Sequence, residues 1–401
     1  MTLRRLLILL AAAGTLVPAV AACGGSDAPS GGGGGSDSAK PIIIGAAVAE
    51  SGGFELYDGG QTAGMKYAID KINAAGGVNG RKFELITADH KTDPAQVQAA
   101  AQDVLDKGAD VVVTTVDYDF GAPAALAARR ANKVSISGAG APEFGLKGLG
   151  PLHFNVYQGT PTESVTMAQL AYTTQKLRHP YLLEDTSIQY SKSLCTEFES
   201  AWAKLAGPGT IAGKDTFKNS DPSIASQLSK IKSTGSADFV VMCSYPPGGA
   251  SAIRQLRTAG VNLPVYGGSG FDGTFWTDAV PDLSDFYHPA MVSSAGDDPN
   301  SAVNQFLSSV KFSGSASYAL FGYEVIETIK AGIEKAGTAS GPELAKGIES
   351  LQNAPFLVGP TSYSATCHAP IGRSMAMMKI DHGKASYVTS ITPTGVPETA
   401  C

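Results

Sequence analysis

Two stretches of this chain follow the same plan. DPAQVQAAAQDVLDKGADVVVT begins at Asp93, and DPSIASQLSKIKSTGSADFVVM begins at Asp221. In each stretch an Asp-Pro pair, which favours the first turn of a helix, precedes a helical segment. A second aspartate, Asp110 or Asp238, follows at the same spacing in both and leads into a Val-rich strand. The repeat predicts two structurally similar halves.

Short apolar runs alternate with helical segments around both copies, which is typical of βαβ units and a mostly parallel sheet. The expected strands are PIIIGAAVA, KFELITA, DVVVTT and KVSISG in the first half and PYLLEDTS, TIAGKDTF, ADFVVMCS and LPVYGGSG in the second. The expected helices are about 60–75, the segments after Asp93 and Asp221, PAALAARRAN, about 191–205 and GGASAIRQLRTAG. The chain has 401 residues and 43% hydrophobic content, enough for two cores. We therefore predict an α/β fold of two doubly wound parallel-sheet lobes.

Residues 1–22 have the pattern of an export signal. Two arginines precede an apolar run from Leu6 to Val20, and small residues follow. A transmembrane helix is the alternative. Gly14 and Pro18 interrupt the run, however, and it is short for a hydrocarbon layer of about 30 Å. The export signal is therefore the preferred interpretation.

The tetrapeptide Val20-Ala21-Ala22-Cys23 resembles the lipobox of bacterial lipoproteins. The resemblance implies a lipid on Cys23 and an extracytoplasmic location, anchored to the cell membrane. The residues that follow, GGSDAPSGGGGGSDSAK, contain almost no apolar side chains, so residues 23–40 are expected to form a flexible tether.

Charge and motifs exclude several classes of function. The formal net charge is −6 and basic clusters are lacking, which argues against nucleic acid as a partner. The six histidines show no metal-ligand spacing, and HExxH, CxxC, GxSxG and P-loop motifs do not occur. The sequence therefore predicts no enzyme, no metal site and no cofactor.

Four cysteines remain besides Cys23, an even number for an oxidising compartment. They allow three pairings. We favour Cys195 with Cys243, because neighbouring elements of one α/β unit contain both, and Cys367 with Cys401 near the C-terminus. Four free, buried thiols are the alternative.

Four segments within residues 41–401 carry a family resemblance: IIIGAAVAESGGFELYDGGQTAGMKYAIDKINAAGGVNGRKFELITAD, DPAQVQAAAQDVL, YLLEDTSIQYSKS and YALFGYEVIETIKAGIEKAG. With them, residues 41–401 resemble the branched-chain amino acid type of periplasmic substrate-binding protein, the ligand-capturing component of ABC importers. The family implies two lobes joined by a three-crossover hinge, closing on a ligand with amine and carboxylate groups. The implied crossovers fall near Tyr157, near His288 and near 355–359. Lobe 1 is then 41–157 plus 289–358, and lobe 2 is 158–288 plus 359–401.

The same resemblance implies a function. We expect a monomeric solute-binding lipoprotein that captures a small polar metabolite, such as an amino acid or a related amine, amide or nucleoside-like compound. Its partners would be the membrane and ATPase subunits of an ABC importer. A sensor lipoprotein that signals to a membrane partner is the alternative, because the same fold also serves in receptors.

Ligands of parallel sheets bind at the carboxyl ends of the strands, so the loops there supply the candidate site. Residues 116–120 should mirror 244–248, and 138–141 should mirror 267–271. The aromatic candidates could instead be packing residues, and Trp276 fits a core or rim position better. The candidate ligand-binding residues are Glu50, Ser51, Phe54, Tyr57, Asp117, Tyr118, Asp119, Ala139, Gly140, Gln189, Tyr190, Ser244, Tyr245, Ser269 and Phe271.

Two departures from the family pattern bear on the ligand. Asp117 and Asp119 stand where the family has serines for the ligand carboxylate, and Ser269 stands where it has an acid for the ligand amine. A carboxylate beside a carboxylate is unfavourable unless one is protonated. We therefore expect a ligand without an exposed carboxylate at that end, either cationic or neutral with several N–H donors. Alternatively, both aspartates face solvent.

Overall fold

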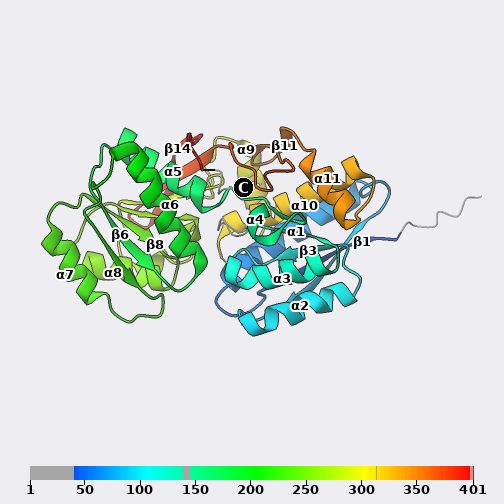
Figure 1. Cartoon of the computed structure of the whole chain (residues 1–401), viewed down its shortest axis with the longest axis horizontal. Helices are drawn as coiled ribbons and strands as arrows, with labels where there is room; N and C mark the ends of the chain where they lie inside the picture. The colour runs from blue at the N-terminus through cyan, green and yellow to red at the C-terminus, as the bar shows by residue number, and fades with distance from the viewer. Residues whose placement is uncertain (1–39, 139–144, 313, 398–400) are drawn as a thin grey trace, which may run out of the picture. The chain divides into compact units, whose positions relative to one another are not determined.

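The computed structural model describes residues 40–138, 145–312, 314–397 and 401 (Figure 1). The predicted export signal, tether and Cys23 therefore lie outside the described residues, and so do Ala139 and Gly140. Within the described residues, no helix is both long enough and apolar enough to cross a membrane.

The first lobe is built on a parallel five-stranded sheet with the order β2-β1-β3-β4-β5. Its strands are β1 (Ile42–Val48), β2 (Phe83–Asp89), β3 (Val111–Thr114), β4 (Val134–Ser137) and β5 (His153–Asn155). The helices between them are α1 (Glu55–Ala74), α2 (Pro94–Asp106), α3 (Tyr118–Arg130) and α4 (Leu146–Leu149). Both faces of β1 are buried, since Ile44 packs in the cluster that contains α1 and Ala47 in the one that contains α2 and α3. This burial explains why the strand is apolar throughout.

The second lobe repeats this order as β7-β6-β8-β9-β10 and then adds β13 and β14 as antiparallel strands. The strands are β6 (Pro180–Asp185), β7 (Gly213–Phe217), β8 (Phe239–Cys243), β9 (Val265–Gly267), β10 (Phe286–Ala290), β13 (Met375–Asp381) and β14 (Lys384–Ile391). The helices are α5 (Gly159–Gln169), α6 (Gln189–Ala206), α7 (Ala225–Thr234) and α8 (Gly248–Thr258). The predicted pair of doubly wound lobes is confirmed, whereas the two antiparallel strands were not predicted.

Three later helices return to the first lobe: α9 (Ser301–Ser309), α10 (Ala316–Ala336) and α11 (Gly341–Glu349). A short antiparallel pair, β11 (Ala354–Phe356) and β12 (Gly359–Thr361), follows them. Helix α10 runs directly against α1 (Figure 1). A Cβ at Gly64 of α1 or at Gly322 of α10 would collide with the other helix's backbone, so glycine permits this close crossing.

The repeated aspartates at the strand starts have the same role in both lobes. Asp110 precedes β3, and its Oδ2 accepts a hydrogen bond of 3.1 Å from the backbone N–H of Ile43 in β1. Asp238 precedes β8, and its Oδ1 accepts one of 2.8 Å from the N–H of His179, next to β6. Each side chain therefore joins the starts of two neighbouring parallel strands. This shared contact explains why both copies keep the aspartate.

The Asp-Pro pairs, in contrast, differ between the copies. Asp93 is the N-cap of α2 and accepts from the N–H of Ala95 at 2.9 Å, as predicted. The predicted cap at Asp221 is wrong, because α7 begins only at Ala225. The Asp221 carboxylate instead accepts from the N–H of Lys218 at 2.8 Å and closes a turn before the helix.

This difference gives a matched pair of variants. Asp93→Ala is expected to lower the free energy of unfolding by about 1 kcal/mol, because the first turn of α2 loses its side-chain acceptor. Asp221→Ala removes no helix cap and should cost less. Urea unfolding of both variants measures the two losses, and equal losses would contradict the assigned cap.

Both favoured disulfides form in the structure, and the alternative of four free thiols is wrong. Cys195 of α6 pairs with Cys243 at the end of β8, with their Cα atoms 5.5 Å apart. Cys367 pairs with Cys401 across 4.4 Å. The first bond joins two elements of one α/β unit, and the second fixes the C-terminal residue.

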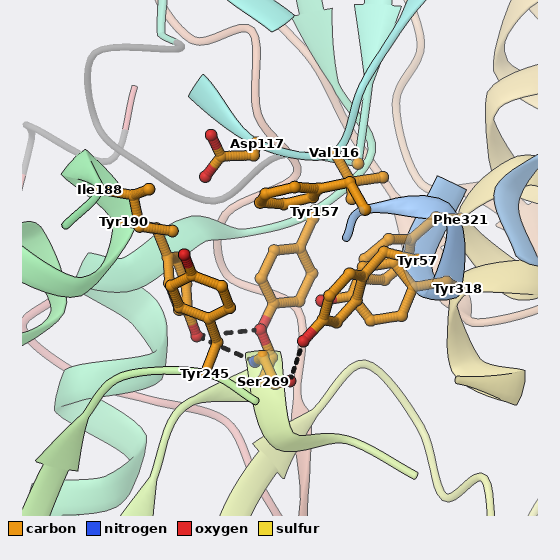
Figure 2. Close-up of a pocket in the computed structure, with 13 residues that line it drawn as sticks. Tyr57, Val116, Asp117, Tyr157, Ile188, Tyr190, Tyr245, Ser269, Tyr318 and Phe321 are labelled. Atoms are coloured by element: carbon orange, nitrogen blue, oxygen red, sulfur yellow. Dashed lines mark hydrogen bonds between the residues drawn. The ribbon is translucent and has the colours of Figure 1, made fainter. Parts of the chain in front are cut away.

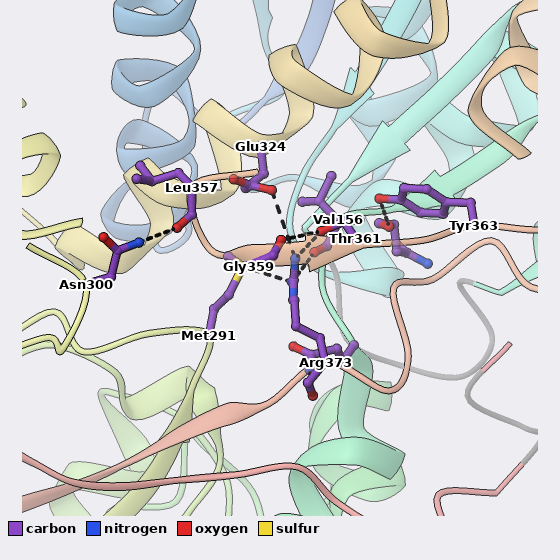
Figure 3. A network of polar contacts seen from close by, with 11 residues as sticks. Val156, Met291, Asn300, Glu324, Leu357, Gly359, Thr361, Tyr363 and Arg373 are labelled. Atoms are coloured by element: carbon purple, nitrogen blue, oxygen red, sulfur yellow. Dashed lines mark hydrogen bonds and ion pairs between the residues drawn. The ribbon is translucent and has the colours of Figure 1, made fainter. Parts of the chain in front are cut away.

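The connections between the two sheets meet at one buried side chain, Arg373 (Figure 3). Its Nη2 donates to the carbonyl of Val156, in the first connection, at 2.9 Å and lies 3.2 Å from Sδ of Met291 in the second. Its Nη1 donates to Thr361 Oγ1 at 3.0 Å and lies 4.0 Å from Glu324 of α10. One guanidinium therefore contacts all three connections.

The contacts before Arg373 bear on the lobe boundaries. Tyr363 donates to the carbonyl of Asn155 at 2.9 Å, and His368 lies 3.0 Å from Glu349 of α11. Residues 359–372 thus pack against elements of the first lobe. We propose that the third crossover lies near Arg373 and not near 355–359, with the first two after β5 and β10.

Candidate ligand-binding site

A cavity opens between the carboxyl ends of the two sheets (Figure 2). It encloses about 400 Å³ of space not occupied by atoms, part of which is open to solvent. Its lining combines residues of both lobes, namely Phe54, Tyr57, Val116, Asp117, Gly138, Tyr157, Ile188, Tyr190, Tyr245, Ser269, Gly270, Tyr318 and Phe321.

The first-lobe wall is aromatic and firmly held. Phe54 and Tyr57 lie at the start of α1, and the Tyr57 ring centroid is 5.1 Å from that of Tyr318 in α10. Asp58 is fully buried beneath this wall and accepts from the N–H groups of Ala49 at 2.7 Å and Val116 at 3.1 Å. It thereby ties the loop after β1 to the loop after β3. Burial raises the pKa of Asp58 to about 6.

Asp117 is the acid in the cavity lining. It is the N-cap of α3, and its Oδ1 accepts from the N–H of Asp119 at 2.9 Å. Only 4% of the residue is exposed, so the alternative that Asp117 faces solvent is wrong. Burial, reinforced by the neighbouring Asp119, raises the pKa of Asp117 to about 7.

A third buried acid, Glu163 of α5, supports the second-lobe wall. Its carboxylate accepts from the N–H of Ser269 at 2.8 Å, from Ser269 Oγ at 2.9 Å and from Tyr190 OH at 3.0 Å. Burial raises the pKa of Glu163. The sequence prediction missed this residue. The sequence feature that could have indicated Glu163 is that it is the sole charged residue between Phe154 and Gln175.

Tyr157 comes from the first connection and lies in the middle of the lining (Figure 2). Its hydroxyl is buried near Ser269 and Glu163 but, within the described residues, makes no hydrogen bond of ordinary geometry. Burial and the nearby Glu163 raise the pKa of Tyr157 well above its usual value, so the phenol is neutral. A neutral hydroxyl in this position can donate to or accept from a bound solute.

Direct hydrogen bonds cross from one lobe to the other around the cavity. Tyr57 OH donates to the carbonyl of Gly270 at 3.2 Å, and the N–H of Gln189 donates to Asp119 Oδ2 at 2.7 Å. Ser315 Oγ donates to the carbonyl of Asp272 at 2.7 Å. The lobes are thus in contact, and the cavity lies between facing loops, as the repeat predicted.

Six predicted site residues line the cavity: Phe54, Tyr57, Asp117, Tyr190, Tyr245 and Ser269. The aromatic members among them border the cavity and also pack in or against an apolar core cluster. Of the other lining residues, Val116, Gly138 and Gly270 lie in loops that were predicted to form the site but were not named as candidates. Sequence reasoning missed Tyr157, Ile188, Tyr318 and Phe321.

The remaining predicted residues lie outside the lining, and each has a different local role. Glu50 and Ser51 bond to Asp89 of β2 at 3.0 and 2.7 Å, which fixes the first loop. Asp119 and Gln189 bond to each other across the lobes.

Three further predicted residues have supporting positions. Tyr118 packs on the apolar cluster around Leu149. Ser244 donates to Asp185 at 2.7 Å. Phe271 is a core residue, fully buried with its ring centroid 5.0 Å from that of Trp276, so its assignment to the site is wrong. Trp276 itself is buried in the same core, as expected.

The comparisons with known proteins agree with this architecture. A profile of the periplasmic binding protein family matches residues 41–385. The chain belongs to this family. Among curated members, the Leu/Ile/Val-binding protein BraC3 of Rhizobium johnstonii is 26% identical over 86% of this chain and 92% of that protein.

Solved structures show the same fold. The branched-chain amino acid transporter substrate-binding protein LivJ of Streptococcus pneumoniae, in complex with isoleucine, has a TM-score of 0.74 at 21% identity, covering 87% of this chain and 99% of LivJ. A solute-binding protein of R. palustris in complex with 4-hydroxybenzoate has a TM-score of 0.76 at 13% identity, covering 89% of this chain and 98% of that protein. The periplasmic binding fold of this chain is therefore established.

The described part of the cavity lining contains an acid but no cationic side chain. Of the residues that the structure describes, the lining includes no lysine, arginine or histidine. Nor do three or more His, Cys, Asp or Glu side chains gather as a metal site would require, among the same residues. The titratable groups of this lining are the Asp117 carboxyl and five tyrosine hydroxyls.

Proposed function

We propose that this chain is the extracytoplasmic solute-binding lipoprotein of an ABC importer. It captures a small polar solute between its lobes and delivers it to the membrane and ATPase subunits, without a catalytic step of its own. The observation that supports this function best is the cavity, because both lobes of a periplasmic binding protein build its wall. The curated relatives, named for leucine, isoleucine and valine, support a solute of amino-acid size.

Lobe closure is the physical basis of capture. A ligand that contacts both lobes favours the closed arrangement by its differential affinity for that arrangement. Tyr57, Gly270 and Asp119 already connect the lobes by hydrogen bonds around the cavity. The importer would then recognise the closed protein.

The membrane anchor is part of the same proposal. The export signal of residues 1–22 and the lipobox ending at Cys23 support lipidation, and the glycine-rich segment to residue 40 supports a flexible tether. Such a protein works as a monomer close to the membrane that contains its importer.

Solute binding should stabilise the folded chain. In a panel of amino acids, amines, amides, nucleosides and aromatic acids, we expect one class to raise the thermal transition of the purified full chain. A solute at 100 times its dissociation constant adds about 2.7 kcal/mol to the free energy of unfolding. Scanning fluorimetry measures the shift. If no solute in the panel shifts the transition, the proposed function is wrong.

A further inference from the structure

The chemistry of the solute can be narrowed from the charges and rings around the cavity. This inference rests on the proposed function and goes beyond it. Asp117 lines the cavity with 4% exposure, and no cationic side chain of the described lining compensates it. Isolated buried charges are costly unless they are paired. A cationic solute would supply the missing opposite charge.

We propose that the solute is a small organic cation, an amine or quaternary ammonium without a carboxylate, whose charge pairs with Asp117 between the aromatic rings of both lobes. A neutral amide could also donate N–H groups to Asp117, but at pH 8, where this carboxyl is ionised, it would leave the negative charge uncompensated. A cation removes that cost, so the structure favours it over the neutral alternative.

The aromatic side chains supply the second part of the recognition. The ring centroid of Phe54 lies 5.6 Å from that of Tyr57 and 6.1 Å from that of Tyr245, which belongs to the other lobe. Tyr57 in turn lies beside Tyr318, and Tyr318 beside Phe321, at 5.1 and 4.8 Å. Figure 2 shows the ring of Tyr245 on one side of the cavity and those of Tyr57, Tyr318 and Phe321 on the other. Rings arranged around a cation attract it through their electron-rich faces.

Glu163, the buried acid of the second-lobe wall, does not compete with Asp117 for a cationic solute. Both oxygens of Glu163 are occupied by Ser269, and one also accepts from Tyr190. Glu163 therefore orients two lining residues. Asp117, by contrast, accepts on Oδ1 from the N–H of Asp119, and its side chain borders the cavity directly.

A ligand carboxylate would be repelled, because the charged groups around Asp117 are also acids. Asp117 faces Asp119 on its own helix, Asp58 and Tyr57 on α1, and Tyr245 in the loop after β8. Burial raises the pKa of both tyrosines, so they stay neutral, and the remaining groups are acids. An anion placed here meets no opposite charge on the described lining.

The test uses two matched series of probes on the purified full chain. One series is leucine, isoamylamine, 4-methylpentanoate and 4-methylpentanamide, and the other is phenylalanine, phenethylamine, 3-phenylpropanoate and 3-phenylpropanamide. Within a series the carbon skeleton is nearly constant while the charge changes. In titration calorimetry at pH 8, we expect the amine of at least one series to bind at least tenfold tighter than its amino acid, acid and amide.

The pH dependence gives an independent readout. Because a bound cation favours ionised Asp117, affinity for the amine should rise about tenfold between pH 6 and pH 8, across the pKa of about 7. Asp117→Asn should weaken amine binding and abolish this rise. Asp221→Asn, in a turn outside the cavity, is the matched control and should change neither.

Three results would overturn the inference: tighter binding of an acid or amino acid than of its amine, equal binding of amide and amine, or no binding by either series. If another panel solute then shifts the thermal transition, the proposed function stands and only the cationic class is wrong. If nothing in the panel binds, both are wrong.

Discussion

Arg373→Met is expected to lower the free energy of unfolding by about 3–5 kcal/mol, the usual cost of removing one partner of a buried ion pair. Arg373 is 6% exposed and Glu324 is 1% exposed. Burial raises the pKa of Glu324 to about 7 even with the guanidinium nearby. Methionine has a similar length but returns none of the hydrogen bonds to Val156 and Thr361. The variant therefore leaves Glu324 without its cationic partner, and the Val156 carbonyl and Thr361 Oγ1 without their donor.

Two further variants separate this effect from a general loss of an arginine. Arg81 lies at the surface, 4.0 Å from Asp110, and Arg81→Met should cost about 1 kcal/mol or less. Glu324→Gln in the Arg373→Met background removes the unpaired acid and should recover part of the lost free energy of unfolding. Denaturant unfolding measures all three proteins. An Arg373→Met loss no greater than that of Arg81→Met would show that the buried pair adds nothing.

Asp117→Asn should have the opposite effect on the ligand-free protein and stabilise it at pH 8. The pKa of Asp117 rises from 3.8 to about 7 on folding, so the folded state holds its proton more tightly than the unfolded state. The free energy of unfolding therefore falls as pH rises from about 4 to about 7, by at most about 4 kcal/mol. Asparagine keeps the helix-capping oxygen without this penalty.

The gain should depend on pH in a defined way. It should be fully present at pH 8, smaller at pH 5 and absent below pH 4, where aspartate is protonated in both states. Thermal unfolding of wild type, Asp117→Asn and Asp221→Asn at these three pH values measures it. A pH-independent gain, or none at pH 8, would mean that Asp117 is not under electrostatic strain in the cavity.

Much of the fold could be predicted because it depends on local patterns. The central strands β1, β3 and β8 are continuous apolar runs, and the same sheet order occurs in each lobe. The Asp221 cap failed because a turn at Lys218 competes for the same carboxylate. Strands β13 and β14 were missed since they add to the sheet from the far end of the chain, although β14 alternates between exposed and half-buried positions as an edge strand does.

The site residues, too, could be predicted only where local sequence order determines their position. Residues in loops that follow predicted strands, such as Asp117, Tyr245 and Ser269, could be placed from the order of the elements. Tyr157, Tyr318 and Phe321 could not, because they reach the cavity from a connection and from α10, which docks only in the folded protein. Phe271 was misplaced for a related reason. Its loop faces the cavity, but the side chain turns into the core against Trp276.

Shared capture by both lobes is the centre of this account, and binding by one variant from each lobe tests it most directly. With the panel solute that raises the thermal transition most, titration calorimetry would compare wild type, Phe54→Ala, Tyr245→Ala and, as a control outside the cavity, Tyr387→Ala. We predict that both cavity variants lose about tenfold or more in affinity, about 1.4 kcal/mol each, while the control binds like wild type. A loss confined to one lobe, or absent from both, would contradict capture between the lobes.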